Sequence, residues 1–239
     1  MTATGALLSV RDLHAHYGKS HILHGVNLDV KKNEVVSLLG RNGSGRSTTM
    51  KAVMGLVPPS SGSVNLAGRE LAGARPYSIN RCGIAYVPEE REVFANLTVD
   101  ENLRMGEQKA VPGARKWTVH DMFDYFPRLK ERRNVGAGSL SGGEQQMLTI
   151  CRSLMGNPLV ILIDEPTEGL APKIVTAVGE CIKDLHSKGV SVLLVEQKLA
   201  IALKVSTRVC VMGHGSIVFE GTPEQLSSDK KLLAEWLAV

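Results

Sequence analysis

One short segment, residues 40–48, constrains this chain more than any other. It reads Gly-Arg-Asn-Gly-Ser-Gly-Arg-Ser-Thr and fits the phosphate-binding pattern G-x-x-x-x-G-K-[S/T], except that Arg46 stands where the pattern has lysine. An apolar run at 35–39 precedes it and predicts a buried strand, and a helical pattern follows at 48–54. A strand, a glycine-rich loop and a helix in this order predict an α/β fold that binds a nucleotide.

The loop residues suit contact with phosphate. Glycines allow positive φ and close backbone approach, so successive N–H groups can point at phosphate oxygens from a helix N-terminus. The hydroxyl of Ser47 is the predicted ligand of Mg²⁺. The predicted nucleotide contacts are Gly40, Arg41, Asn42, Gly43, Ser44, Gly45, Arg46, Ser47 and Thr48. From this segment alone, a glycine-rich turn that fits the pattern by chance remains the alternative.

Composition narrows the class of protein. At 239 residues the chain can form one large α/β domain with a small lobe. The net charge of +4 comes without a long basic run and gives no argument for nucleic acid. The four cysteines are widely spaced, without a C-x-x-C pattern or clustered histidines, so we expect reduced thiols in a cytoplasmic protein and assign the cysteines no metal site.

No leader peptide or membrane span is predicted. The N-terminus lacks a basic region followed by a long apolar run, and no apolar segment approaches the ~20 residues of a membrane span. We therefore expect any association with a membrane to go through a partner.

Two kinds of strand pattern predict a mixed sheet. Residues 8–10 and 26–30 alternate as in antiparallel strands, whereas 160–163 and 190–195 are nearly continuous apolar runs, which suit a parallel sheet covered on both faces. Residues 209–212 and 216–219 predict a hairpin.

Helical periods dominate another part of the chain. Between residues 90 and 155 they include 99–105 and 119–126 and predict a helical lobe inserted into the sheet domain. Pro223 is expected to open a terminal helical stretch.

Two adjacent carboxylates end the apolar run at 160–163. Asp164 and Glu165 occupy a costly place for charge unless a cation or a reacting group is there. Asp164 is therefore the predicted Mg²⁺ ligand, and Glu165 the predicted general base that polarises the attacking water. The alternative interpretation is that Asp164 and Glu165 are solvent-exposed acids at a strand end that leads into a turn at Pro166.

A third motif, Leu-Ser-Gly-Gly-Glu at residues 140–144, has two compatible interpretations. Ser141 and Glu144 fit a capping box that opens a helix over residues 145–155. Gly142 and Gly143 weaken a first helical turn by roughly 1 kcal/mol each relative to alanine, so they suit a place where backbone amides approach a phosphate.

These motifs, in this order, resemble the ATP-binding subunits of ABC transporters, whose signature is L-S-G-G-[QE]. The resemblance extends over nearly the whole chain. It implies a head-to-tail dimer in which Ser141, Gly142 and Gly143 complete the partner's nucleotide site. Tyr17 matches the aromatic residue that stacks on adenine in this family; the alternative is a core tyrosine at a strand end.

Residues 88–99, 165–172 and 195–197 are similar to the shorter ATPase subunit of branched-chain amino-acid importers and of their urea or amide relatives. Glu89 takes the place of a glutamine that senses γ-phosphate, which makes it a nucleotide and metal contact by resemblance. Gln197 takes the place of the switch histidine and is assigned a catalytic role. Arg46 is atypical even of this subfamily, because its forked guanidinium is bulkier than the ammonium of lysine and is directed differently.

The resemblance implies a P-loop NTPase (RecA-like) core with a mixed sheet, an antiparallel β subdomain and an inserted helical subdomain. The expected division is a core of residues 6–89 and 156–221, a helical subdomain at 90–155 and a C-terminal helical segment at 222–239, in one domain over 1–239.

The expected activity is hydrolysis of Mg-ATP that drives a permease to import branched-chain amino acids or similar polar solutes, or else urea or amides. Expected partners are permease subunits, a second ATPase subunit or a second copy, and a solute-binding protein, with the chain on the cytoplasmic face of the membrane. A weakly hydrolytic subunit that completes its partner's site is an alternative. An ABC ATPase acting on nucleic acid is disfavoured by the single nucleotide domain and the absence of basic runs.

Overall fold

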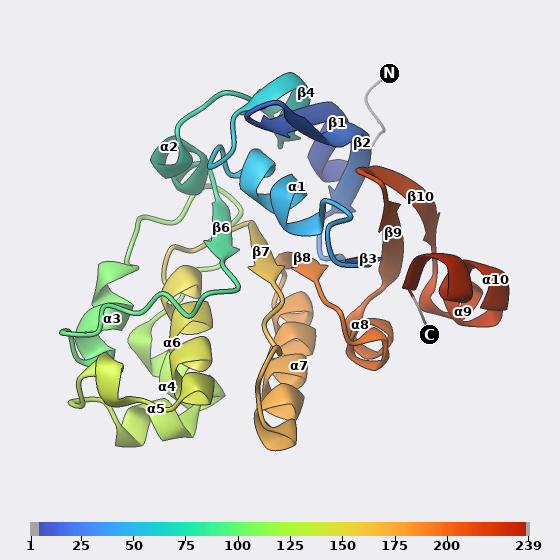
Figure 1. Cartoon of the computed structure of the whole chain (residues 1–239). Helices are drawn as coiled ribbons and strands as arrows, with labels where there is room; N and C mark the ends of the chain where they lie inside the picture. The colour runs from blue at the N-terminus through green and yellow to red at the C-terminus, as the bar shows by residue number, and fades with distance from the viewer. Residues whose placement is uncertain (1–4, 238–239) are drawn as a thin grey trace.

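The computed structural model describes residues 5–237, and in this range the strands form two sheets (Figure 1). The smaller sheet is antiparallel, with the order β2-β1-β4-β5, and the larger has the order β10-β9-β3-β8-β7-β6. In the larger sheet β9 and β10 are antiparallel and the other neighbours are parallel, which confirms the predicted mixed sheet. The strands are β1 (Ala6–Tyr17), β2 (Ser20–Lys31), β3 (Val35–Gly40), β4 (Pro59–Leu66), β5 (Arg69–Glu70), β6 (Ile84–Val87), β7 (Val160–Asp164), β8 (Ser191–Val195), β9 (Arg208–Gly213) and β10 (Ser216–Gly221).

The helices fall into groups that Figure 1 separates. Helices α3 to α6 lie together at the lower left, away from the antiparallel sheet at the top, and α1 lies just below that sheet. The helices are α1 (Arg46–Val53), α2 (Pro76–Arg81), α3 (Val99–Met105), α4 (Val119–Tyr125), α5 (Pro127–Glu131), α6 (Gly142–Leu154), α7 (Pro172–Ser187), α8 (Leu199–Val205), α9 (Pro223–Ser228) and α10 (Lys230–Leu232), with a 3-10 turn at Ala137–Ser139 and a π turn at Leu233–Leu237. Helices α1 and α6 each begin earlier than the sequence pattern predicts.

The central strands β3, β7 and β8 of the larger sheet are buried on both faces, which explains their continuous apolar sequences. Along β7, Val160 and Leu162 pack into the core shared with α1 and the antiparallel sheet. Ile161 and Ile163, which point the other way, pack into the core shared with α6, α7 and the helical lobe. The strand therefore anchors Asp164, its last residue, between two cores.

Four histidines gather on one hairpin, although the sequence analysis noted no clustered histidines beside the cysteines. His14 and His16 on β1 and His21 and His24 on β2 lie together on one hairpin, with their rings in contact. These four residues lie close together along the chain, and the register of β1 and β2 brings their rings side by side. All four cysteines are free, as expected of reduced thiols.

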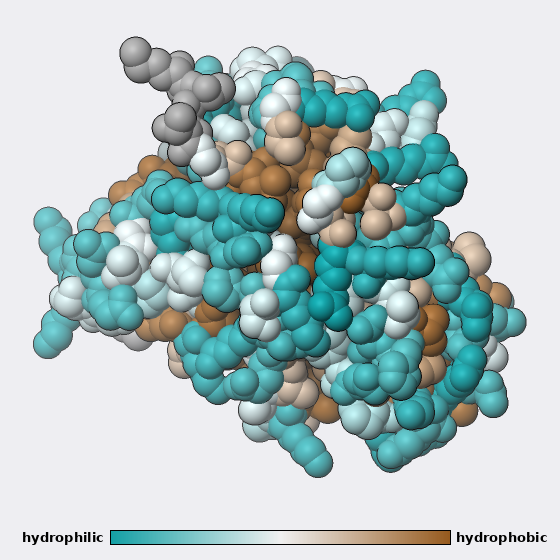
Figure 2. Space-filling model, turned by 180° about the vertical axis from the view of Figure 1, so that it is seen from behind, coloured by the Kyte–Doolittle hydropathy of each residue, from teal (hydrophilic) through white to brown (hydrophobic). Residues whose placement is uncertain are grey.

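The outer surface is mainly hydrophilic. Figure 2 shows the molecule from behind, where hydrophobic residues form a band near the upper middle between hydrophilic regions. None of the helices within residues 5–237 is both long enough and apolar enough to cross a bilayer.

Candidate functional site

The phosphate-binding loop joins β3 to α1 and is shaped by glycine. Gly45, the N-cap of α1, has a φ of 104°, a conformation that favours glycine. A Cβ atom at Gly40 would lie 2.5 Å from the carbonyl oxygen of Met212, so only glycine fits there. Thr49 Oγ1 donates a hydrogen bond of 2.9 Å to the carbonyl of Gly45 and holds the first helical turn. The loop therefore has the backbone that a phosphate cradle requires.

A cavity of about 270 Å³ opens over this loop and brings together most of the predicted site. It is lined by Asn42, Gly43, Ser44, Gly45, Arg46, Ser47, Thr48, Glu89, Glu165, Glu168 and Gln197. Gly40 and Arg41 line a neighbouring cavity together with Asn42 and Gln197. The sequence analysis did not predict Glu168 as a site residue. This residue lies in the turn after Glu165 and does not directly follow a strand, so no local pattern indicated it.

Arg46 crosses the cavity toward the predicted general base. Its Nη2 lies 3.0 Å from Glu165 Oε1, and the two side chains are only 4% and 6% exposed. Nη2 also donates to Asn42 Oδ1 at 3.2 Å, and Nη1 donates to the carbonyl oxygen of Glu196 at 3.3 Å. The guanidinium thus neutralises a buried carboxylate, and loss of one partner of such a pair costs about 3–5 kcal/mol.

Glu165 is held by its backbone as well as by its side chain. It has a φ of 44°, unusual for a residue with a side chain, and its N–H donates to the carbonyl of Val195 at 2.9 Å. Its carboxylate also accepts a hydrogen bond from the Gln197 amide. Burial raises the pKa of Glu165 to about 7, while Arg46 acts in the opposite direction. A carboxyl group with a pKa near neutrality suits a general base.

Asp164 directs both carboxylate oxygens into polar contacts. Oδ1 accepts a hydrogen bond of 3.0 Å from Ser47 Oγ, and Oδ2 accepts one of 3.1 Å from Tyr86 Oη. Burial raises the pKa of Asp164, although both hydrogen bonds lower it. The two predicted Mg²⁺ ligands, Ser47 and Asp164, therefore lie in contact. The sequence analysis did not predict that Tyr86 joins them.

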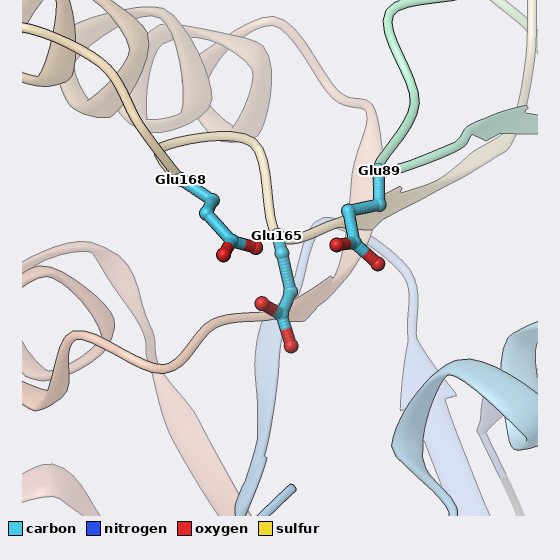
Figure 3. Close-up of side chains that lie close together, drawn as sticks. All are labelled: Glu89, Glu165 and Glu168. Carbon is cyan, nitrogen blue, oxygen red and sulfur yellow. The ribbon is translucent and has the colours of Figure 1, made fainter.

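Three carboxylates converge at the edge of the cavity. Glu89, Glu165 and Glu168 point toward one another, and each offers an oxygen within 4.8 Å of the others (Figure 3). No second group of three such donors occurs in the part of the chain that the structure describes. Burial, and then the neighbouring charge of Glu168, raises the pKa of Glu89. Such crowding of negative charge favours protonation or a bound cation.

A buried network behind the cavity positions Gln197. Glu196 is 2% exposed and accepts hydrogen bonds from Thr167 Oγ1 at 2.8 Å and from the N–H groups of Gln197 and Lys198 at 3.0 Å each. Lys198 Nζ donates to the carbonyl of Thr167 at 2.9 Å. The network ties the segment after β7 to the segment after β8. The sequence interpretation missed it because its members are far apart along the chain.

Tyr17 and residues 141–143 are predicted contacts that also lie outside this cavity. Tyr17 ends β1 and is 48% exposed. Ser141 caps α6: its Oγ accepts from Glu144 N at 3.3 Å, and its own N–H donates to Glu144 Oε2 at 2.8 Å, which confirms the capping box. Ser141 lines a different groove, with Glu144, Lys173 and Ile174 among others. Gly142 and Gly143 follow it in the first turn of α6.

Comparison with known proteins identifies the architecture. The family described as ABC transporter matches residues 23–168. BraG of Pseudomonas aeruginosa, named a high-affinity branched-chain amino acid transport ATP-binding protein, is 43% identical over 231 residues, which cover 97% of this chain and 99% of BraG. The chain belongs to the ABC transporter family.

Two further ABC proteins agree with this assignment. LivF of Archaeoglobus fulgidus, named a probable branched-chain amino acid transport ATP-binding protein, is 37% identical and covers 94% of this chain and 96% of its own length. A crystal structure of the ADP conformation of an ATP-binding cassette of an ABC transporter has a TM-score of 0.81 at 28% identity, covering 96% of this chain and 98% of its own. The predicted P-loop NTPase fold and the resemblance to importer ATPases are confirmed.

Proposed function

We propose that this ABC ATPase binds and hydrolyses Mg-ATP to drive an importer of branched-chain amino acids or related polar solutes. The observation that carries the proposal is the likeness to BraG over almost the full length of both chains, combined with a cavity that unites the phosphate-binding loop and Glu165. The expected partners are permease subunits, a second ATPase subunit or a second copy of this chain, and a solute-binding protein. Through the permease the chain would lie at the cytoplasmic face of the membrane. Urea or amide import is the alternative within this class.

The contacts support a distinct role for each side chain. The loop amides would hold the β- and γ-phosphates, and Tyr17 the adenine. Ser47 and Asp164 already lie in hydrogen-bond contact, both offer oxygen, the ligand atom that Mg²⁺ prefers, and Glu89 lines the same cavity as Ser47. The ion would neutralise charge on the phosphates. Glu165 would accept the proton of the attacking water while Gln197 orients its carboxylate.

The domain division follows from the same assignment. Residues 6–89 and 156–221 would form the nucleotide-binding core, 90–155 the helical subdomain and 222–239 the C-terminal segment. In a head-to-tail dimer, the N-terminus of α6 at Ser141, Gly142 and Gly143 would face the partner's nucleotide. The position of Ser141 outside this chain's own cavity supports that arrangement.

The ion pair between Arg46 and Glu165 favours a second candidate function. A subunit whose general base is held by arginine could hydrolyse ATP weakly and serve mainly to complete its partner's site. Turnover by the isolated subunit, compared with turnover by the complex purified with its permease and partner ATPase, separates the two functions. Strong turnover that requires this chain's Glu165 supports the first. Turnover that depends only on the partner's base supports the second, and stimulation by nucleic acid would contradict both.

The role of Ser141 can be tested by substitution. Ser141→Arg introduces bulk and charge at the proposed dimer interface, so ATP turnover by the complex is expected to fall at least tenfold. This chain's own ATP affinity, measured by calorimetry on the isolated subunit, should change little. Loss of the cap costs only about 1 kcal/mol of stability. Ser228→Arg, on the exposed end of α9, is the control. Collapse of ATP binding in the isolated Ser141 variant would show that the residue supports only the local fold.

A further inference from the structure

The β1–β2 hairpin carries a group of metal-ligating side chains that the ATPase site does not use. His14 pairs with His24, and His16 with His21, on facing strands. The buried neighbours Leu13, Ala15 and Leu23 point into the core, so the imidazoles project from the opposite face of the hairpin. Four imidazoles therefore gather on one face of this sheet.

His21 is the centre of the group. Its ring centroid lies 4.1 Å from that of His16, 4.0 Å from that of His24 and 5.2 Å from that of His14. Desolvation and the neighbouring imidazoles lower the pKa of His21. His21 is thus in contact with each of the other three rings, and a metal ion would bind the nitrogen lone pair of its neutral form.

Two ring nitrogens lie at nearly the separation that two ligands of one metal ion have. His14 Nδ1 lies 3.0 Å from His21 Nε2. Two imidazole nitrogens bound to one tetrahedral zinc ion at about 2.0–2.1 Å each are roughly 3.3 Å apart, so the observed separation is close to that of a shared ion, and both rings would turn to direct their lone pairs at it. In the absence of an ion the same contact is a hydrogen bond from one ring N–H to the other ring nitrogen.

His14 and His16 each have a polar partner outside the histidine group, as histidines that bind metals commonly do. The other nitrogen of His14, Nε2, lies 3.1 Å from Asp12 Oδ1, the carboxylate partner that ligating histidines commonly have. His16 Nδ1 lies 3.1 Å from Ser60 Oγ on β4, which leaves Nε2 of His16 free to turn toward an ion. The backbone of Asp12 has a φ of 46° and its N–H donates to Asn27 Oδ1 at 3.1 Å, while the carboxylate is largely exposed.

We propose that the hairpin binds one divalent transition-metal ion, of the class of Zn²⁺, Ni²⁺ or Cu²⁺, through His14 Nδ1 and His21 Nε2, with His16 or His24 as a third ligand and Asp12 orienting His14. Imidazole nitrogen selects this class over Mg²⁺. No three of these donors converge at present, so the third arrives by rotation of an exposed side chain, a motion of picoseconds to nanoseconds.

A bound ion would link β1 to β2 next to their turn. Tyr17 pairs with Ser20 directly beside the pair of His16 and His21. The link would therefore restrain the strand end that carries Tyr17, the proposed adenine contact. This consequence rests on the proposed function, but the proposal that the hairpin binds a metal does not.

Calorimetric titration of the full, nucleotide-free chain with Zn²⁺, in excess Mg²⁺ to occupy the carboxylate cluster, tests the proposal. One equivalent of Zn²⁺ is expected to bind. Asp12→Asn should weaken binding about ten- to hundred-fold. The double variant His14→Gln with His21→Gln should abolish this binding event. His186→Gln, on α7, is the matched control and should change nothing.

The outcomes are distinct. Equal Zn²⁺ affinity in the wild type and the double variant, or no binding in either, would overturn the proposal. A second double variant, Glu89→Gln with Glu168→Gln, tests the carboxylate cluster. If Zn²⁺ binding is lost in this variant but kept in the double histidine variant, the ion binds at the carboxylates, and the proposal is overturned as well. If the double variant is unstable in a thermal unfolding scan, Asp12→Asn alone decides, because asparagine keeps the shape of aspartate.

Discussion

Glu165→Gln is expected to lower ATP turnover about 10²- to 10⁴-fold, the usual contribution of a positioned general base. The amide keeps the size of the side chain but cannot accept a proton. ATP binding should persist, because the loop amides and Ser47 are unchanged, and the variant should accumulate as an ATP-bound dimer. Phosphate release and gel filtration with ATP measure the two effects. Glu180→Gln, at an exposed position on α7, is the control.

The pH dependence gives an independent check on Glu165. Its pKa of about 7 in the free chain means that kcat/KM for ATP should rise about tenfold per pH unit below 7 and level off above it, because only the ionised carboxylate accepts a proton. The residual activity of Glu165→Gln should lack this component. Turnover in the variant equal to wild type, or the same pH profile in both, would remove Glu165 from the mechanism.

Arg46→Lys is expected to tighten Mg-ATP binding or to raise turnover about ten- to hundred-fold, the equivalent of one well-placed charged hydrogen bond to phosphate. Lysine would supply a compact charge between the β- and γ-phosphates. The structure adds a second reason, since the guanidinium is engaged with Glu165, Asn42 and the Glu196 carbonyl, so phosphate has to compete for it. Calorimetry and turnover, in the isolated subunit and in the assembled complex, measure the effect.

The control for this substitution is Arg69→Lys on the exposed strand β5. A stability check accompanies it, because the shorter lysine weakens a buried ion pair and could lower the unfolding temperature without touching the nucleotide. If the lysine variant binds and turns over ATP no better than the wild type in either preparation, the loop has adapted to arginine.

Local patterns predicted the parts of the site that lie next to their own strand or helix. The loop after β3 follows from glycine spacing, and Asp164 and Glu165 follow from the end of a buried strand. The capping box at Ser141 follows from the serine and glutamate spacing alone. Each of these features needs only neighbouring residues, and the α/β class follows from them, whereas the subdivision of the fold was predicted from the resemblance to ABC ATPases.

Contacts between distant segments could not be predicted in the same way. Arg46 meets Glu165 because β3 and β7 both flank β8 in the sheet, an order that no local pattern encodes. Glu196 meets Thr167 through a buried network between two loops. The histidine group depends on the register of β1 and β2, including bulges that the alternation of side chains does not reveal.

The most direct test of the proposed transport function is uptake of radiolabelled leucine into proteoliposomes that hold this chain with its co-purified permease, partner ATPase and solute-binding protein. We expect uptake that requires ATP and falls to background when this chain carries Glu165→Gln, while the complex stays assembled. Uptake of leucine that is undiminished by that substitution would contradict it, and a complex that hydrolyses ATP without moving leucine or another branched-chain amino acid would contradict this class of solute.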